Sequence, residues 1–253
     1  FYPEVAAIKS DIADYYFEVQ RFDSDCNKAI KMLEESGELD NTIIVMTGDH
    51  GMPFPRCKSN LYDMGVRVPL AIRWGKNIKA NRRIEDFVSL TDLAPTFLEA
   101  AGVKVPSQIT GKSLIPILKS KKNKKVDKQR SHMIFGKERH VPAQLSPSMA
   151  GYPSRGIRTK EYLYIYNFKP ELWPAGVPEN ATHPMGSFAD CDNGPTKTFL
   201  MKNKDNPKYK VFYNLSFGKR PAEELYKIKK DPYQLNDLAK DIYRFIFPKH
   251  SAK

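Results

Sequence analysis

The spacing of hydrophobic residues predicts a long helix at the start of this 253-residue chain. Over residues 4–36 the apolar side chains recur every three or four positions, which is the spacing of one face of an α-helix. This face consists of Val5, Ile8, Ile12, Tyr15, Tyr16, Val19, Phe22, Cys26, Ile30 and Leu33. We therefore expect one amphipathic helix that packs against a sheet.

The pattern then changes to that of strands separated by helices. Residues 43–46 are apolar without alternation, which is typical of a strand covered on both faces, as in a parallel sheet. Residues 70–74 form a second strand-like run. Helical spacing returns over 88–101 and stops at Gly102, where glycine commonly ends a helix. Residues 131–135 predict a further strand.

From about residue 154 the pattern indicates a smaller and different structure. Short aromatic runs at 156–159, 162–166 and 211–215 are separated by Pro and Gly and predict strands of an antiparallel sheet. The segment from the 190s to residue 202 predicts a short helix. Residues 170–195 form a loop too long for a simple turn, and such loops often line binding sites.

Candidate chemistry first appears where the apolar strand 43–46 ends. Ligands of open α/β folds bind beyond the carboxyl ends of such strands, and Asp49 and His50 fall at that position. A carboxylate and an imidazole that share a crevice can bind a divalent cation. Gly51 permits a sharp turn after them. An Asp-His pair that only caps this turn is the plain alternative.

The residues that follow resemble the sulfatase family. In sulfatases a strand ending in Asp-Asn-Gly or Asp-His-Gly is followed by Lys-x-x-x-Tyr-[Asp/Glu]-Gly-Gly-x-Arg-x-Pro. This chain has Lys58 four residues before Tyr62 and then matches through residue 69, except that Met64 replaces the first glycine. Further similar segments follow in the same order at 88–102, 111–114, 224–227 and 231–239. Segments 51–55, 60–62 and 152–159 resemble most closely the sulfamidases, the N-sulfoglucosamine sulfohydrolases.

The resemblance implies an α/β fold in two parts. Residues 1–150 would be the C-terminal part of a catalytic domain with a mixed, mostly parallel sheet flanked by helices. Residues 151–253 would form a small antiparallel-sheet α+β subdomain. The implied activity is hydrolysis of sulfate esters or sulfamates on a sulfated sugar, such as a glycosaminoglycan-type glycan of the heparan sulfate kind.

The resemblance also implies roles for individual residues. Asp49 would bind Ca²⁺, a hard cation that prefers oxygen ligands, and His50 would contact the metal or the sulfate group. Lys58 would donate to a sulfate oxygen, although most lysines in a chain with 41 Lys and Arg are plain surface residues. His140 and His183 are candidate substrate contacts, each with a solvated loop histidine as its alternative. Other possible sugar contacts in the long loop and just after it are Asp190, Asp192 and Lys197.

The family's nucleophile has no counterpart in this chain. In sulfatases it is a formylglycine made from Cys or Ser in Cys/Ser-x-Pro-x-Arg, but Cys26, Cys57 and Cys191 all lack a proline two residues later. We therefore expect a carboxyl-terminal fragment, inactive alone, with the formylglycine encoded upstream. The three cysteines predict no disulfide framework. Cys57 adjoins Lys58, which would stabilise its thiolate.

Charge leaves two further hypotheses open. The net charge is +12, and residues 119–128 contain six lysines without the aromatic residues that stack on bases, so we expect a solvated loop and no nucleic-acid partner. The basic charge could instead attract a polyanionic glycan.

No apolar run is long enough to span a membrane, and the resemblance implies export to the periplasm, the lysosome or the cell exterior. The alternatives are a phosphodiesterase or phosphonate hydrolase of the same superfamily, and a non-catalytic basic glycan-binding remnant.

Overall fold

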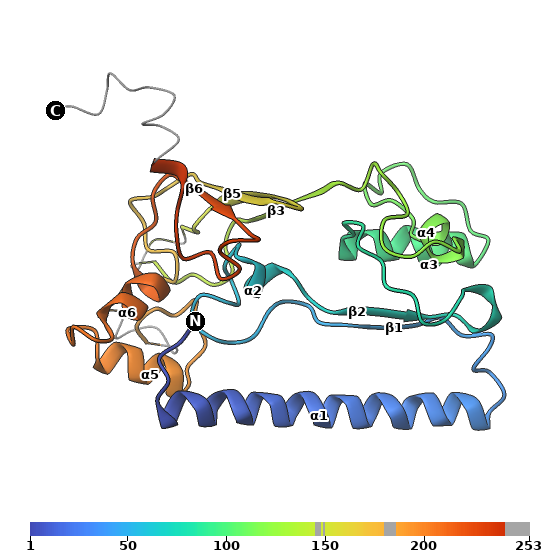
Figure 1. Ribbon diagram of the computed structural model, residues 1–253, viewed down its shortest axis with the longest axis horizontal. Coiled ribbons are helices and arrows are strands. Elements are labelled where there is room, and N and C mark those ends of the chain that lie inside the picture. The colour runs from blue at the N-terminus through green and yellow to red at the C-terminus, as the bar shows by residue number, and fades with distance from the viewer. Residues whose placement is uncertain (145–147, 149, 180–185, 241–253) are drawn as a thin grey trace, which may run out of the picture. The chain divides into compact units, whose positions relative to one another are not determined.

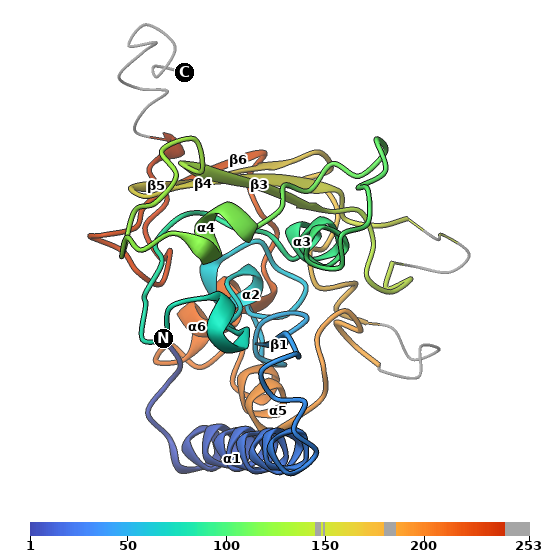
Figure 2. The same cartoon turned by 90° about the vertical axis from the view of Figure 1, so that its right-hand side faces the viewer.

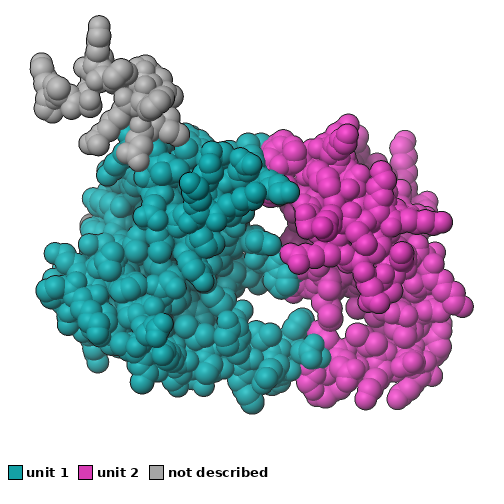
Figure 3. All heavy atoms as spheres, viewed as in Figure 1, with its two compact units in different colours: residues 1–23, 48–69, 134–253 teal, residues 24–47, 70–133 magenta. Residues whose placement is uncertain are grey.

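The computed structural model describes residues 1–144, 148, 150–179 and 186–240. The chain forms two compact units, each drawn from several segments (Figure 3). Unit 1 comprises Phe1–Asp23, Gly48–Pro69 and Ile134–Lys253, and unit 2 comprises Ser24–Thr47 and Leu70–Met133. The boundary expected between residues 150 and 151 stays a prediction.

Helix α1, Ala6–Glu35, is the long helix that the apolar spacing predicted (Figure 1). Its first residues belong to unit 1 and the rest to unit 2. Ile8 is the one helix residue in the buried class. Large apolar side chains that stay exposed are Tyr16, Phe17, Val19, Phe22 and Met32. The helical period was therefore predictable, whereas much of the apolar face is not covered by the described residues.

Unit 2 contains a two-stranded sheet. Strands β1, Ile44–Thr47, and β2, Leu70–Arg73, pair antiparallel, with Ile44 opposite Arg73 and Thr47 opposite Leu70. Both strands lie where the sequence predicted them. All four residues of β1 are only half-buried. The expectation of a mostly parallel sheet around this strand stays a prediction.

The helices of unit 2 are held by a buried ion pair. The 3-10 helix η2, Leu90–Asp92, leads into α3, Leu93–Ala100, and α4 follows at Ile115–Lys119. The Asp92 carboxylate accepts from the Arg130 guanidinium at 2.7 Å and from the Lys112 N–H at 2.8 Å. Gly102 has φ +70° and ends the helix as predicted. The sulfatase-like segments 88–102 and 111–114 are thus two sides of one packed contact.

A four-stranded sheet forms the centre of unit 1. Its strands lie in the order β3, His132–Lys137, β4, Ser154–Thr159, β5, Tyr162–Asn167, and β6, Glu223–Lys227 (Figures 1 and 2). The β4–β5 and β5–β6 pairs are antiparallel, as expected for this part of the chain. Leu163 and Ile165 from β5 pack with Leu61, Tyr62 and Tyr226 in a buried cluster. The sheet therefore carries the segment that follows Lys58.

A second cluster in unit 1 corrects one prediction. Residues 211–215 were expected to form a strand, but they lie within helix α6, Lys210–Phe217. Phe217 packs with Phe188 and with Leu200 of helix α5, Pro195–Lys202. Helical spacing brings Phe212 and Tyr213 to the same cluster, and a five-residue aromatic run is compatible with either period. The fourth strand is β6, which the sequence analysis had identified only as a family signature.

Candidate functional site

The turn after β1 presents an acid and an imidazole to solvent. The side chains of Asp49 and His50 are 87% and 39% exposed, and Asp49 Oδ1 accepts from the His50 backbone N–H at 2.9 Å. His50 Nδ1 lies 2.8 Å from the Gly51 carbonyl oxygen. Because a carbonyl can only accept, this contact requires a proton on Nδ1. Nε2 then offers a lone pair in the neutral ring, which suits a metal, or an N–H in the protonated ring, which suits an anion. Nε2 lies 3.6 Å from Asp49 Oδ2, so two potential ligand atoms stand side by side.

These atoms fit part of a calcium site. The open Asp49 carboxylate is the kind of oxygen ligand that Ca²⁺ prefers, whereas an imidazole nitrogen suits softer metals better. Among the described residues, no group of three or more His, Cys, Asp and Glu is placed to hold a metal ion. This part of the chain therefore offers one well-suited ligand rather than a complete set.

Two glycines bring this turn against helix α2, Asp63–Val66. The Gly51 N–H donates to the Gly65 carbonyl at 2.9 Å. A Cβ on Gly51 would lie 1.8 Å from the Met64 carbonyl oxygen, and a Cβ on Gly65 would lie 2.3 Å from that of Cys57. Neither position has room for a side chain. Met64 stands where the family pattern has glycine, and it contacts the turn through its backbone carbonyl oxygen.

The spacing from Lys58 to Tyr62 has a structural reason. The Tyr62 hydroxyl donates to Glu224 of β6 at 2.7 Å, and the ring stacks under the buried Arg56 guanidinium at 3.7 Å. Next to it, Asp63 accepts two hydrogen bonds from Arg158 of β4, at 2.8 and 2.9 Å. The loop that carries Lys58 is thus fixed to the four-stranded sheet by aromatic and ionic contacts.

Lys58 is held by an acid from the long loop. Its Nζ lies 2.9 Å from Asp192 Oδ2, and its side chain is 20% exposed. Its backbone N–H donates to the Met52 carbonyl at 3.0 Å, which places it close to the Asp49–His50 turn along the backbone. The structure therefore does not support the reading of Lys58 as a freely solvated lysine.

His140 is held by the neighbouring acid of the same loop. Asp190 is buried, with its Oδ1 at 2.6 Å from His140 Nδ1 and its Oδ2 at 2.8 Å from Lys137 Nζ. Lys137 also donates to the carbonyl of Ser59, at 2.8 Å, and so connects this group to the Lys58 loop. The sequence analysis missed Lys137, whose only available signal was its position at the end of a strand. His183 lies outside the described residues.

Lys197 has a structural role in place of the sugar contact considered above. Its side chain is buried, and its Nζ donates to the carbonyls of Phe188 and Cys191 and to the Asn193 side chain at 2.8–3.0 Å. Burial lowers the pKa of this amine. All three N–H donors are occupied, and they fix the loop segment that carries Asp190 and Asp192.

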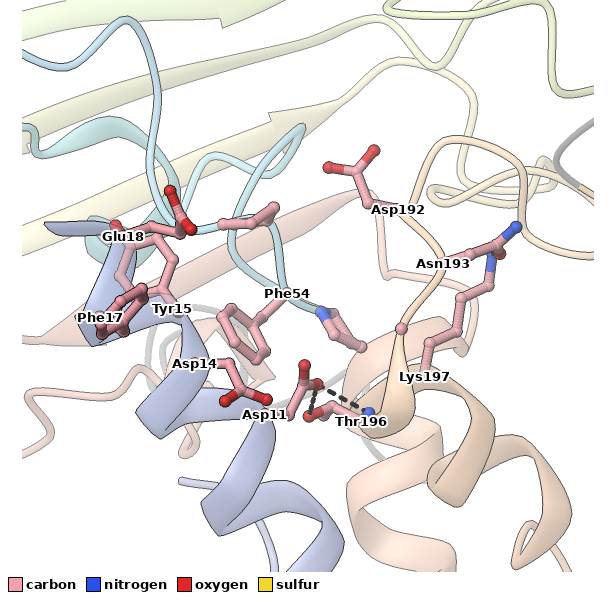
Figure 4. Close-up of a pocket in the computed structure, with 13 residues that line it drawn as sticks. Asp11, Asp14, Tyr15, Phe17, Glu18, Phe54, Asp192, Asn193, Thr196 and Lys197 are labelled. Carbon is pink, nitrogen blue, oxygen red and sulfur yellow. Dashed lines mark hydrogen bonds between the residues drawn. The ribbon is translucent and has the colours of Figure 1, made fainter. Parts of the chain in front are cut away.

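A cavity of about 480 Å³ opens beside Asp192 in unit 1 (Figure 4). The Asp11 carboxylate of α1 accepts from the backbone N–H of Thr196 at 2.9 Å and from its hydroxyl at 2.5 Å, and so caps helix α5. The other lining residues are Asp14, Tyr15, Phe17, Glu18, residues 53–55, Asn193, Gly194 and Lys197. No motif in the sequence pointed to this cavity.

Cys57 differs from the expectation of a stabilised thiolate. Its side chain is fully buried, and burial raises its pKa from 9.0 to about 11. The Lys58 ammonium is directed to Asp192, so the adjacent cation does not offset the loss of solvent around the sulfur.

Comparison with known proteins places this fold and turn among the sulfatases. Residues 48–175, half of the chain, match the family model "N-sulphoglucosamine sulphohydrolase, C-terminal", so the chain belongs to that family. It is 27% identical to a human N-sulphoglucosamine sulphohydrolase over 95% of this chain and 46% of that protein. It is 29% identical to an ulvan-active sulfatase of Formosa agariphila over 94% of this chain and 36% of the relative. The chain therefore spans less than half the length of these relatives.

Among the solved structures, one example is similar to this chain in both sequence and fold. It is 25% identical, covers 91% of this chain and 37% of that one, and superimposes with a TM-score of 0.54. That protein was solved in complex with its substrate, D-glucosamine-2-N,6-O-disulfate.

Proposed function

We propose that this chain forms part of the active site of a sulfatase that hydrolyses sulfate esters or sulfamates on a sulfated sugar, most simply a glycosaminoglycan-type glycan. The observation that carries the proposal is the family match over residues 48–175, which contains Asp49, His50, Lys58 and His140. All four lie in one compact unit with side chains that reach solvent at least in part. The residue roles below belong to this proposal.

The chemistry requires positive charge around the sulfur. A sulfate group is negatively charged, repels nucleophiles, and gains charge on its leaving oxygen or nitrogen during cleavage. When bound, Ca²⁺ would neutralise part of that charge, and the formylglycine of the longer protein would supply the nucleophile. Asp49 would ligate the metal, and His50 Nε2 would face either the metal or the sulfate.

Lys58 is positioned for charge stabilisation. Asp192 takes one of the three N–H donors of its ammonium, and the side chain keeps 20% of its surface exposed. It can therefore donate to a sulfate oxygen while Asp192 holds it in place. His140, and His183 by resemblance, would contact the sugar.

The wider setting follows from the substrate class. Sulfated glycans occur outside the cytoplasm, which supports export of the protein. Among the described residues, no helix combines the length and hydrophobicity needed to cross a bilayer. The partner we propose is a sulfated carbohydrate.

The test uses the protein encoded by the complete gene. Sulfate release is measured from glucosamine carrying N-sulfate or 6-O-sulfate, with and without Ca²⁺, and a phosphodiester and a phosphonate ester are assayed beside them. We expect calcium-dependent sulfate release from at least one sulfated sugar. Turnover of the phosphorus esters alone would indicate the phosphonate hydrolase alternative, and glycan binding without turnover would indicate a binding remnant.

A further inference from the structure

His140, Asp190 and Lys137 form a small charge network that connects a half-exposed imidazole to a buried acid. Asp190 accepts at Oδ1 from His140, at 2.6 Å, and at Oδ2 from Lys137, at 2.8 Å. The Asp190 side chain is only 6% exposed, whereas the His140 side chain is 39% exposed. The imidazole is therefore anchored through Nδ1 while more than a third of its surface stays exposed.

The network fixes the proton on His140. An ionised carboxylate can only accept, so the hydrogen in the His140–Asp190 contact belongs to Nδ1. Lys137 already balances the charge of Asp190, and with a neutral imidazole the three residues carry no net charge. In that state Nε2 has a lone pair and can accept a hydrogen bond.

The loop holds Asp190 on both sides. Its backbone N–H donates to the Ala175 carbonyl at 3.1 Å, and Lys197 binds the carbonyls of Phe188 and Cys191. Lys137 is fixed in turn by the carbonyls of Ser59 and Pro174, at 2.8 and 3.2 Å. The imidazole is thus oriented by groups that are themselves constrained.

We propose that Asp190 is a positioning residue that presents His140 Nε2 as a hydrogen-bond acceptor for a hydroxyl group of the sugar. An acceptor nitrogen fits a hydroxyl, which can donate, and does not fit a fully ionised sulfate oxygen, which cannot. His140 would then select the sugar ring, while Lys58 and the metal ligands act on the sulfate. This inference rests on the proposed sulfatase function.

The kinetic test compares two substrates in the protein encoded by the complete gene. Asp190→Asn should raise KM for the sulfated glucosamine about tenfold, the value of one lost hydrogen bond, with kcat nearly unchanged. Hydrolysis of 4-nitrophenyl sulfate, which has no sugar hydroxyl, should not change. Asp205→Asn, at an exposed position after α5, is the matched control.

A double-mutant cycle separates positioning from a structural effect. His140→Phe removes the acceptor at a half-exposed position, so this variant should fold. If Asp190 acts through His140, Asp190→Asn will add no further rise in KM in the His140→Phe background. An equal rise in both backgrounds, or a loss of 4-nitrophenyl sulfate turnover, would overturn the proposal.

A spectroscopic signature gives a readout independent of activity. In protein labelled with ¹⁵N-histidine, the unsubstituted protein should show the Nδ1–H tautomer of His140. In Asp190→Asn the carboxamide oxygen must face the Lys137 ammonium, which can only donate, so its NH₂ group faces His140 Nδ1 and the ring should shift to the Nε2–H tautomer. A His140 ring in the Nε2–H form in the unsubstituted protein would overturn the positioning role. No sulfate release from either substrate, with the Nδ1–H tautomer intact, would instead refute the proposed function and the sugar contact that depends on it.

Discussion

Lys58 and Asp192 form an ion pair before any substrate is present. Their side chains are 20% and 31% exposed, so the pair is partly shielded from water and from salt. A lysine held in this way loses little conformational freedom when it binds an anion. At the residue scale, acids of one loop orient the cation of Lys58 and the imidazole of His140.

Replacing Lys58 tests its role in charge stabilisation. Lys58→Met should lower kcat for sulfate release by about 10²–10³-fold, the usual cost of removing one donor to developing negative charge. Lys121→Met, in the exposed basic run, is the matched control and should have no effect. An unchanged kcat in Lys58→Met would contradict the assignment.

The proposed role of Asp49 can be tested through the Ca²⁺ dependence of activity. Asp49→Asn keeps the shape of the side chain but removes the charge of the proposed ligand, so the Ca²⁺ concentration for half-maximal activity should rise at least tenfold. Activity titrated against Ca²⁺ measures this. His132→Gln, at an exposed position on β3, is the control. An unchanged calcium requirement would remove Asp49 from the ligand set.

Cys57 should be an unreactive thiol at ordinary pH. Its pKa of about 11, against an ordinary value of 9.0, leaves about a hundredfold less thiolate near pH 8, and its burial blocks access as well. Iodoacetamide labelling followed by mass spectrometry should modify Cys26, which is partly exposed, well before Cys57.

The same shift fixes the sign of a pH effect on stability. The Cys57 thiol keeps its proton in the folded chain up to about pH 11, whereas the unfolded thiol loses it near 9.0. Because the unfolded state then binds fewer protons, the free energy of unfolding should fall as pH rises between these values. Cys57→Ala should weaken this dependence, and a melting temperature measured across this range checks it.

The sequence could predict a shared site only for those residues that lie in one motif. Asp49, His50 and Lys58 sit in a short ordered pattern, and the structure confirms that close backbone contacts need its glycines. Lys137 and Asp190 are 53 positions apart and have no motif, so only the fold reveals their contact. Their charges compensate each other because both side chains are largely buried, and the spacing of apolar residues along the chain does not predict that burial at a strand end or in a loop.

At the scale of elements, the Asp49–His50 turn and helix α2 are fixed by backbone contact. Gly51→Ala would place a Cβ 1.8 Å from the Met64 carbonyl oxygen and should destabilise the protein by about 1–3 kcal/mol. Gly48→Ala is the matched control, because the nearest atom to its new Cβ lies 3.4 Å away. A melting temperature lowered only in Gly51→Ala supports the contact, and equal values would contradict it.

Most helices and strands could be predicted from the sequence, because their apolar residues have a clear spacing or because Gly or Pro marks where they end. Helix α1 and the strands β1 to β5 lie close to their predicted positions. Helix α6 was misread because its aromatic residues satisfy both strand and helix spacing over a short run, and burial against Phe188 and Leu200 decides between them. Tertiary packing, rather than local preference, settles such segments.

At the scale of the whole molecule, the charge of +12 should affect encounter with a polyanionic substrate. The lysines of residues 119–128 are exposed, and exposed charges are screened over about 8 Å at physiological salt. They belong to unit 2, so their contribution to substrate attraction can be varied without altering the residues of unit 1.

The salt dependence of turnover measures this attraction. With a sulfated polysaccharide, kcat/KM should fall as NaCl rises, and the triple variant Lys121→Gln, Lys122→Gln, Lys124→Gln should show a shallower fall. A sulfated monosaccharide, with little charge to attract, is the control and should respond equally in both proteins. Identical slopes on the polysaccharide would exclude steering by this run.

Lys197 makes the loop with Asp190 and Asp192 behave as a single exchangeable part. Its buried ammonium binds the carbonyls of Phe188 and Cys191, on both sides of Asp190. A change at one residue of this loop therefore also affects the hydrogen bonds that hold the others. Substitutions here should be strongly epistatic: a change that is harmless with Lys197 present could be disabling without it. A designer who grafts a new sugar preference from a relative should therefore transplant residues 186–197 as one cassette and leave its internal lysine in place.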